Sequence, residues 1–174
     1  MGFTFNGKHS DSFNIGVSNI QRSLKPSKRV FKTVIGGRDG TYDFTDNTYS
    51  NILFTMTCDY LGTDIGMVKN DLALWLSTSG ELVIDGEENK IYQANIYSDI
   101  PLSQVFYLNQ FTLVFDCFPF AMSLPKQLST IITEQGQETA FQVGGTARTP
   151  CTIIIKNVGD KPITNLRLTH RKEV

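Results

Sequence analysis

The sequence predicts a mainly β protein: an antiparallel β-sandwich with one α-helix and an extended β-hairpin, followed by a partial second β-sandwich. Three observations lead to this prediction. Apolar and polar residues alternate over several short segments, as they do in half-buried strands. A single segment has the spacing of an amphipathic helix. Beyond about residue 124 the composition shifts toward Gln, Thr and Gly. We therefore expect two domains, residues 1–122 and residues 123–174, the second of them incomplete.

The first strands are predicted from alternating apolar residues. Phe3 and Phe5 face one side of a strand, residues 6–8 form a turn, and residues 13–17 resume the same period of two in a second strand. Two further short strands are expected at residues 31–35 and 51–58.

A basic stretch and a glycine-rich turn lie between these strands. Residues 21–32 hold five cations and no carboxylate, which is compatible with a solvated loop or with a charged patch that meets a neighbouring subunit. Residues 36–40 are not a phosphate-binding loop, because no Gly-Lys-Ser/Thr follows. Their glycines are expected to supply positive φ angles to a tight turn.

The helix is expected over residues 64–77, where Val68, Leu72, Trp75 and Leu76 share one face. Trp75, the only tryptophan, is expected to anchor the core. A hairpin follows, with strands at residues 81–84 and 90–97 around an Asp-Gly-containing loop.

The most apolar stretch, residues 105–118, predicts a strand that ends before Pro119. Within it Phe111, Leu113, Phe115 and Cys117 face one way, and Thr112 and Asp116 face the other. Three short strand patterns come later, at residues 139–143, 151–156 and 164–168. About fifty residues are too few to close a second sandwich, which typically takes about 100 residues.

Composition excludes several classes of function. A formal net charge of −1 argues against bulk binding of nucleic acid or anionic membranes. No apolar run approaches the length of a membrane-spanning helix, and the N-terminal residues do not resemble a signal peptide, so we expect no membrane insertion. Three widely spaced cysteines, Cys58, Cys117 and Cys151, are expected to be small buried thiols made in the cytosol.

No residue set looks catalytic or suited to a cofactor or metal. The two histidines, His9 and His170, lie near opposite ends of the sequence, and no Cys or His pair has the spacing of a zinc site. In the acidic turns at residues 39–46 and 85–88, the carboxylates do not have the alternating spacing of the ligands in a calcium-binding loop. Sugar binding is the main alternative to a structural role, since Tyr42, Tyr49, Tyr92 and Tyr97 could stack on sugar rings if exposed. We expect no enzyme activity, no cofactor and no metal.

The order of several motifs resembles the distal tail proteins of long-tailed (siphovirus-type) bacteriophages and prophages. The start Phe3-Thr4-Phe5-Asn6-Gly7 resembles the opening of that family, and residues 35–43, Ile-Gly-Gly-Arg-Asp-Gly-Thr-Tyr-Asp, look like its "GRDG.YD" signature. The helix ending in Leu-Trp-Leu, the hairpin and the strand at residues 111–120 follow in the family's order. The resemblance covers roughly residues 1–122.

The resemblance implies a structural hub at the virion tail tip, assembled in the bacterial cytoplasm. In that family six N-terminal domains close into a ring that joins the tail tube protein to the baseplate or to a tail-associated tip protein, and DNA passes through the lumen without specific binding. The C-terminal domain is galectin-like, faces outward and often docks receptor-binding proteins. Residues 123–174 resemble only the first part of that domain. The alternative function is a galectin-like carbohydrate-binding module that acts in adhesion to the host cell wall.

A ring needs two different surfaces on each subunit. We expect the hairpin at residues 81–97 to reach onto a neighbour, with Leu82, Ile84, Ile91 and Tyr92 as interface residues; the other interpretation is a hairpin packed wholly on its own domain. Arg38 and Asp39 are further interface candidates, which either fix their own turn or pair across the interface.

Overall fold

The computed structural model describes residues 1–105, 108–123, 128–134, 136–141, 144–147 and 152–169. Contacts within the chain divide it into two units, Met1–Thr133 and Glu134–Val174. The division lies eleven residues after the boundary expected from composition. The mainly β fold class predicted from the sequence is confirmed, because the described residues of the first unit form one large antiparallel sheet and one α-helix.

The described part of the first unit forms ten strands, two short 3-10 helices and one α-helix. In chain order these are β1 (Phe3–Phe5), β2 (Lys8–His9), η1 (Ser10–Phe13), β3 (Ile15–Arg22), β4 (Lys32–Val34), β5 (Thr41–Asp43), β6 (Ile52–Tyr60), η2 (Ile65–Met67), α1 (Lys69–Leu76), β7 (Gly80–Ile84), β8 (Tyr92–Asn95), β9 (Leu102–Val105) and β10 (Leu108–Cys117).

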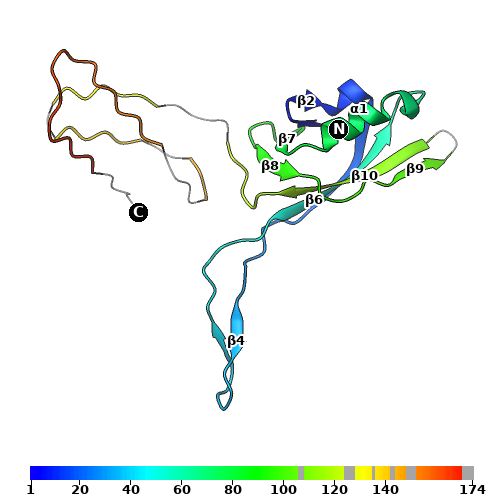
Figure 1. The fold of residues 1–174 in the computed structure, drawn as a ribbon, viewed down its shortest axis with the longest axis horizontal. Coiled ribbons are helices and arrows are strands. Elements are labelled where there is room, and N and C mark those ends of the chain that lie inside the picture. The colour runs from blue at the N-terminus through cyan, green and yellow to red at the C-terminus, as the bar shows by residue number, and fades with distance from the viewer. Residues whose placement is uncertain (106–107, 124–127, 135, 142–143, 148–151, 170–174) are drawn as a thin grey trace. The chain divides into compact units, whose positions relative to one another are not determined.

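The large sheet has the strand order β2-β1-β7-β8-β10-β6-β3, with β9 pairing along part of β10. All its pairs are antiparallel, and the longest ladder joins β10 to β6 over nine residue pairs, from Asn109↔Tyr60 to Cys117↔Ile52. Strands β4 and β5 form a separate two-stranded ribbon that stands clear of this sheet (Figure 1).

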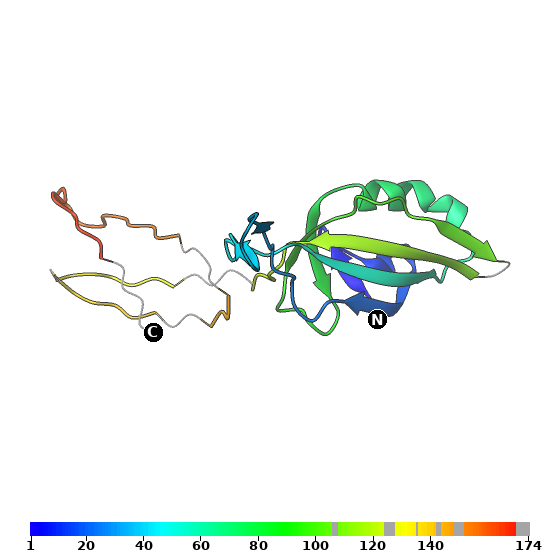
Figure 2. The same ribbon diagram turned by 90° about the horizontal axis from the view of Figure 1, so that it is seen from below.

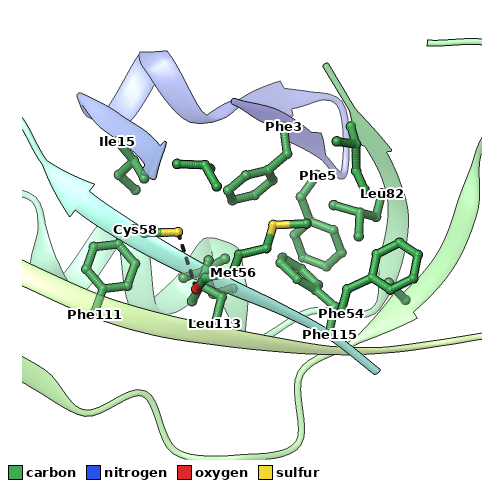
Figure 3. Close-up of a cluster of buried hydrophobic side chains, with 14 of the residues drawn as sticks. Phe3, Phe5, Ile15, Phe54, Met56, Cys58, Leu82, Phe111, Leu113 and Phe115 are labelled. Atoms are coloured by element: carbon green, nitrogen blue, oxygen red, sulfur yellow. Dashed lines mark hydrogen bonds between the residues drawn. The ribbon is translucent and has the colours of Figure 1, made fainter. Parts of the chain in front are cut away.

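The large sheet folds over on itself and encloses the core. The rings of Phe3 and Phe5, on β1, lie with centroids 5.5 and 5.2 Å from that of Phe115, on β10. Strands β7 and β8 separate β1 from β10 in the sheet order, so these contacts require two facing layers. Figure 3 shows the aromatic rings of β1 above those of β6 and β10. Val17 N–H donates to Met1 O at 2.9 Å and ties the free edge of β3 to the start of the chain.

The N-terminal strands differ in part from the sequence prediction. Asn6 and Gly7 have φ angles of 52° and 76°, so they form the expected tight turn, but the strand paired across it is β2. Phe13, expected in a strand, ends the 3-10 helix η1 instead. Its ring stacks on Trp75 at 4.7 Å, a tertiary contact that period-two alternation could not reveal.

The expected helix over residues 64–77 is present but divided. The Asp64 carboxylate accepts a hydrogen bond from Gly66 N–H at 2.8 Å and caps η2, and α1 begins only at Lys69. The predicted packing face is confirmed for Leu72, Trp75 and Leu76, which are buried. Trp75 also donates its indole N–H to Phe5 O at 2.8 Å, so it anchors β1 as well as the helix.

The predicted hairpin is confirmed, and the last strand is confirmed over β10. Val105 ends β9 instead, and residues 106 and 107 lie outside the described part. Strands β7 and β8 pair in the register Leu82↔Tyr92, and β10 buries Phe111, Leu113, Phe115 and Cys117 while Thr112 and Asp116 remain partly exposed. Figure 2 shows β6 and β10 side by side below the helix.

The three strands expected in the C-terminal part are not seen in the second unit's described residues. Residues 139–141, 152–156 and 164–168 carry no strand, and Ile153, Ile154 and Ile155 are 52, 84 and 53% exposed. Residues 142, 143 and 151, which belonged to two of those expected strands, lie outside the described part. The physical reason is that a strand is stable only when a partner strand pairs its backbone, and this segment supplies too few residues to bury its apolar side chains.

A candidate interaction surface

The ribbon β4–β5 continues into a longer structure, residues 23–50, which we call the arm. Beyond the register Lys32↔Asp43, Thr33↔Tyr42 and Val34↔Thr41, backbone hydrogen bonds extend the pairing. Phe44 N–H donates to Phe31 O at 2.8 Å, Arg29 N–H to Thr48 O at 3.0 Å and Ser50 N–H to Ser27 O at 2.9 Å. From residue 23 on, the basic stretch that the sequence left open between a solvated loop and a charged patch is therefore one side of this arm, whereas Arg22 ends β3.

One face of the arm is aromatic and exposed. Side chains alternate across a strand, so Phe31 and Thr33 share a face with their partners Phe44 and Tyr42. The Phe44 ring lies 6.3 Å from Phe31 and 6.0 Å from Tyr42. Phe31 is 66% and Phe44 60% exposed. A two-stranded ribbon is marginally stable alone in water, so an exposed aromatic face on such a ribbon indicates a binding surface.

The tip of the arm is the glycine-rich turn. Gly37 and Gly40 have φ angles of 77° and 82°, which confirms the expected role of glycine in this turn. The Arg38 guanidinium carbon lies 4.6 Å from the Tyr42 ring centroid, and the guanidinium donates a hydrogen bond to the Tyr42 hydroxyl. Arg38 thus fixes its own turn, and it lines an open hollow of about 290 Å³ together with Asp39.

Two successive Asp-x-Thr turns shape the returning side of the arm. Asp43 accepts hydrogen bonds from the hydroxyl and the N–H of Thr45, and Asp46 does the same with Thr48. These donors, the hydroxyls first, lower the pKa of both exposed carboxyl groups. At neutral pH both carboxylates are therefore ionised and can accept these hydrogen bonds from Thr45 and Thr48.

The root of the arm is held by an ion pair that sequence reasoning missed. Arg22, the last residue of β3, donates to Glu87 in the β7–β8 turn, with Nη1 2.9 Å from Oε2. The Arg22 guanidinium also lies over the Phe54 ring at 5.5 Å. The hydrogen bonds from Arg22 lower the pKa of Glu87 to about 2. Neither residue carries a sequence signal, because they are 65 positions apart and meet only through the sheet.

An apolar hollow lies beside this root. Its volume is about 590 Å³, and Tyr49 and Phe120 meet there with ring centroids 5.2 Å apart. Lys25 and Lys28 contribute to its wall. All residues that line this hollow except Phe120 belong to the arm.

The six predicted interface residues divide into two groups. Arg38 and Asp39 lie at the exposed tip of the arm. Leu82, Ile84, Ile91 and Tyr92 are 0, 3, 8 and 7% exposed, so their side chains are buried inside this domain. The sequence placed these four residues in a hairpin, and the tertiary structure shows that its strands β7 and β8 pair with β1 and β10 inside the sheet. The correction is that the extended hairpin is β4–β5 rather than β7–β8.

His9 and its acidic neighbours form a cluster with a structural role. His9 lies 3.2 Å from Asp85 and 3.3 Å from Asp11, and it accepts a hydrogen bond from Asp11 N–H. Asp85 in turn accepts a hydrogen bond from Gly2 N–H at 2.6 Å, so this cluster holds the first strand against the β7–β8 turn. His170 lies outside the described residues.

The chain's described part contains no group of three or more His, Cys, Asp or Glu side chains placed to hold a metal ion. Within the same residues no helix has the length and apolar character needed to span a membrane. Burial raises the pKa of the Cys58 and Cys117 thiols to about 12, and the prediction that these two are buried is confirmed. Cys151 lies outside the described part.

The comparisons with known proteins found a similar fold among the solved structures. No protein-family model matches the sequence, and no curated protein matches it. The structure is similar to the crystal structure of SPP1 Dit (gp 19.1), described as a paradigm of the hub adsorption apparatus in phages that infect Gram-positive bacteria. The TM-score is 0.57 at 17% sequence identity, over 67% of this chain. The match spans 49% of the SPP1 protein, about half its length. At this identity the likeness shows a shared fold.

Proposed function

We propose that this chain is a structural hub protein of a phage tail tip, of the distal tail type. The observation that carries the proposal is the fold shared with SPP1 Dit, found for a chain whose motif order independently resembles distal tail proteins. The resemblance is sharpest at residues 35–43, which form the tip of the exposed arm. A surface-exposed signature motif fits a protein that works through contacts with other subunits.

In the proposed assembly six copies close into a ring that joins the tail tube protein to a tail-associated tip protein. DNA would pass through the lumen without specific contacts, in keeping with a formal net charge of −1. Residues 123–174 would begin an outward domain that docks receptor-binding proteins. The proposed place of the protein is the virion tail tip, and its role requires no enzyme activity, cofactor or metal.

The test is the mass of the purified protein by light scattering after size exclusion, at several concentrations, with negative-stain microscopy of the largest species. We expect a species of six protomers, each of 19.5 kDa, and a ring with a central hole. A chain that stays monomeric at every concentration, and that forms no complex with tail tube protein, would contradict the proposal.

The carbohydrate-binding alternative gains no support from the four tyrosines named for it. Tyr92 is buried, Tyr42 lies under the Arg38 guanidinium, and Tyr49 packs against Phe120. Tyr97, 76% exposed, lies on a different segment. These rings do not form a common platform for a sugar.

A further inference from the structure

A second exposed apolar surface lies far from the arm. We call it the distal patch and define it as Leu61, Asp64, Met67, Asp71 and Leu74. Leu61, Met67 and Leu74 are 74, 81 and 72% exposed. Met67 ends η2, and Asp71 and Leu74 are exposed residues of α1, whose buried residues are Leu72, Trp75 and Leu76. Three large apolar side chains so close in sequence and so exposed indicate a surface that another molecule covers.

The arm and the distal patch lie at opposite ends of the same strand. The arm returns to the sheet at Asn51, and β6 then runs from Ile52 to Tyr60, directly before Leu61. Nine residues at the usual rise of a strand span about 26 Å. Figures 1 and 2 both show the arm at one end of β6 and the start of the helical region at the other. The two surfaces of one copy therefore cannot cover each other.

The two surfaces also carry opposite charge. The arm, residues 23–50, holds five Lys or Arg and three Asp, a net charge of +2. Residues 59–77, which include the distal patch, hold three Asp and one Lys, a net charge of −2. The apolar side chains of each surface are thus flanked by charges that attract those of the other, which favours this pairing over arm with arm or patch with patch.

We propose that the aromatic face of the arm of one copy docks on the distal patch of the next copy. Phe31 and Phe44 would then cover Leu61, Met67 and Leu74, with the cations of residues 25–32 near Asp64 and Asp71. Because the two surfaces differ, the contact is heterologous and each copy keeps one free surface of each kind until a ring closes. This inference rests on the proposed tail-hub function and names the two surfaces that join its subunits.

The test uses two variants of the full chain that each lose one surface. The arm variant carries Phe31→Ser with Phe44→Ser, and the patch variant carries Met67→Ser with Leu74→Ser. All four side chains are at least 60% exposed, so both variants should fold, which Trp75 fluorescence and a thermal melt would confirm. Matched controls are Val34→Ser, on the other face of the same ribbon, and Leu53→Ser, an exposed residue of β6.

Light scattering should show each variant as a monomer at concentrations where the wild type and both controls assemble. Mixing the two variants should give a species of two protomers and nothing larger, since only one arm and one patch remain intact between them. A patch variant that assembles like the wild type, or a mixture that stays monomeric while the wild type assembles, would overturn the docking inference and leave the hub function standing. A wild type that stays monomeric at every concentration would overturn the docking inference, and it would overturn the hub function as well if it formed no complex with tail tube protein.

Discussion

At the scale of single residues, Trp75 joins three parts of the core. It stacks on Phe3 and Phe13, with ring centroids 5.7 and 4.7 Å away, and donates a hydrogen bond to Phe5 O. The helix, β1 and η1 therefore depend on one side chain. A buried aromatic residue with a bonded N–H contributes both apolar area and a satisfied polar group.

Replacement Trp75→Phe should lower the free energy of unfolding by about 1–3 kcal/mol, since it removes the bond to Phe5 O and leaves space beside Phe13. Urea denaturation followed by circular dichroism would measure this loss. Asn70→Ala, on the exposed side of the same helix, is the control and should change stability by less than about 0.5 kcal/mol. A loss no larger than that of the control would show that Trp75 does not anchor the core.

The Arg22–Glu87 pair should make stability depend on pH in acid. The folded-state pKa of Glu87 is about 2, below its ordinary value of 4.5. A depressed pKa stabilises the folded state fully above about pH 4.5, and this stabilisation is lost as the pH falls toward 2. Glu87→Gln should therefore be less stable than wild type by about 1 kcal/mol at pH 7, with the difference vanishing near pH 2.

Denaturation curves at several pH values would measure this difference, with Glu88→Gln, an exposed neighbour, as control. A Glu87→Gln difference that stays constant from pH 7 to pH 2 would contradict the assigned role of the carboxylate.

At the scale of elements, the arm buries very little of its surface. Every residue from 31 to 44 is exposed, and the two strands of the ribbon are joined by their own backbone hydrogen bonds. Elements with few buried contacts open most readily. By contrast, α1 contributes Leu72, Trp75 and Leu76 to the core.

Limited trypsin digestion of monomeric protein should cut after Lys28, Arg29 or Lys32 before it cuts after Lys69 or Lys90. Mass spectrometry of early digests would identify the sites. Assembled protein should lose the early arm cuts, because the arm would be covered by a neighbouring copy. Early cutting at Lys69 in place of the arm would contradict the assignment of the arm as the exposed element.

At the scale of the whole molecule, the core belongs to the first unit alone. All buried hydrophobic side chains in the described residues lie between Phe3 and Cys117. The described residues of the second unit carry no strand. The first unit therefore contains what is needed to fold.

A chain of residues 1–133 should fold like the full chain, with a melting temperature within about 5 °C. Thermal unfolding followed by Trp75 fluorescence would measure it. A fall of more than about 10 °C would show that the second unit contributes to the stability of the first.

The amino-acid sequence by itself determined the strand and helix patterns that local periodicity controls. The inward faces of β1 and β10, the packing face of α1, the β7–β8 hairpin and the positive φ angles at Gly37 and Gly40 all follow from short-range spacing and from the freedom of glycine. It also placed Arg38 and Asp39 in a turn whose glycines were expected to have positive φ angles.

Only the tertiary structure decided which hairpin is buried and which is exposed. Both hairpins alternate apolar and polar residues, and the difference lies in their partners. Strands β7 and β8 pair with β1 and β10, whereas among the described residues β4 and β5 form a sheet of two strands. The same holds for the Arg22–Glu87 pair and for the arm and distal patch at opposite ends of β6. Burial and charge pairing depend on which distant segments meet, and no local spacing encodes that.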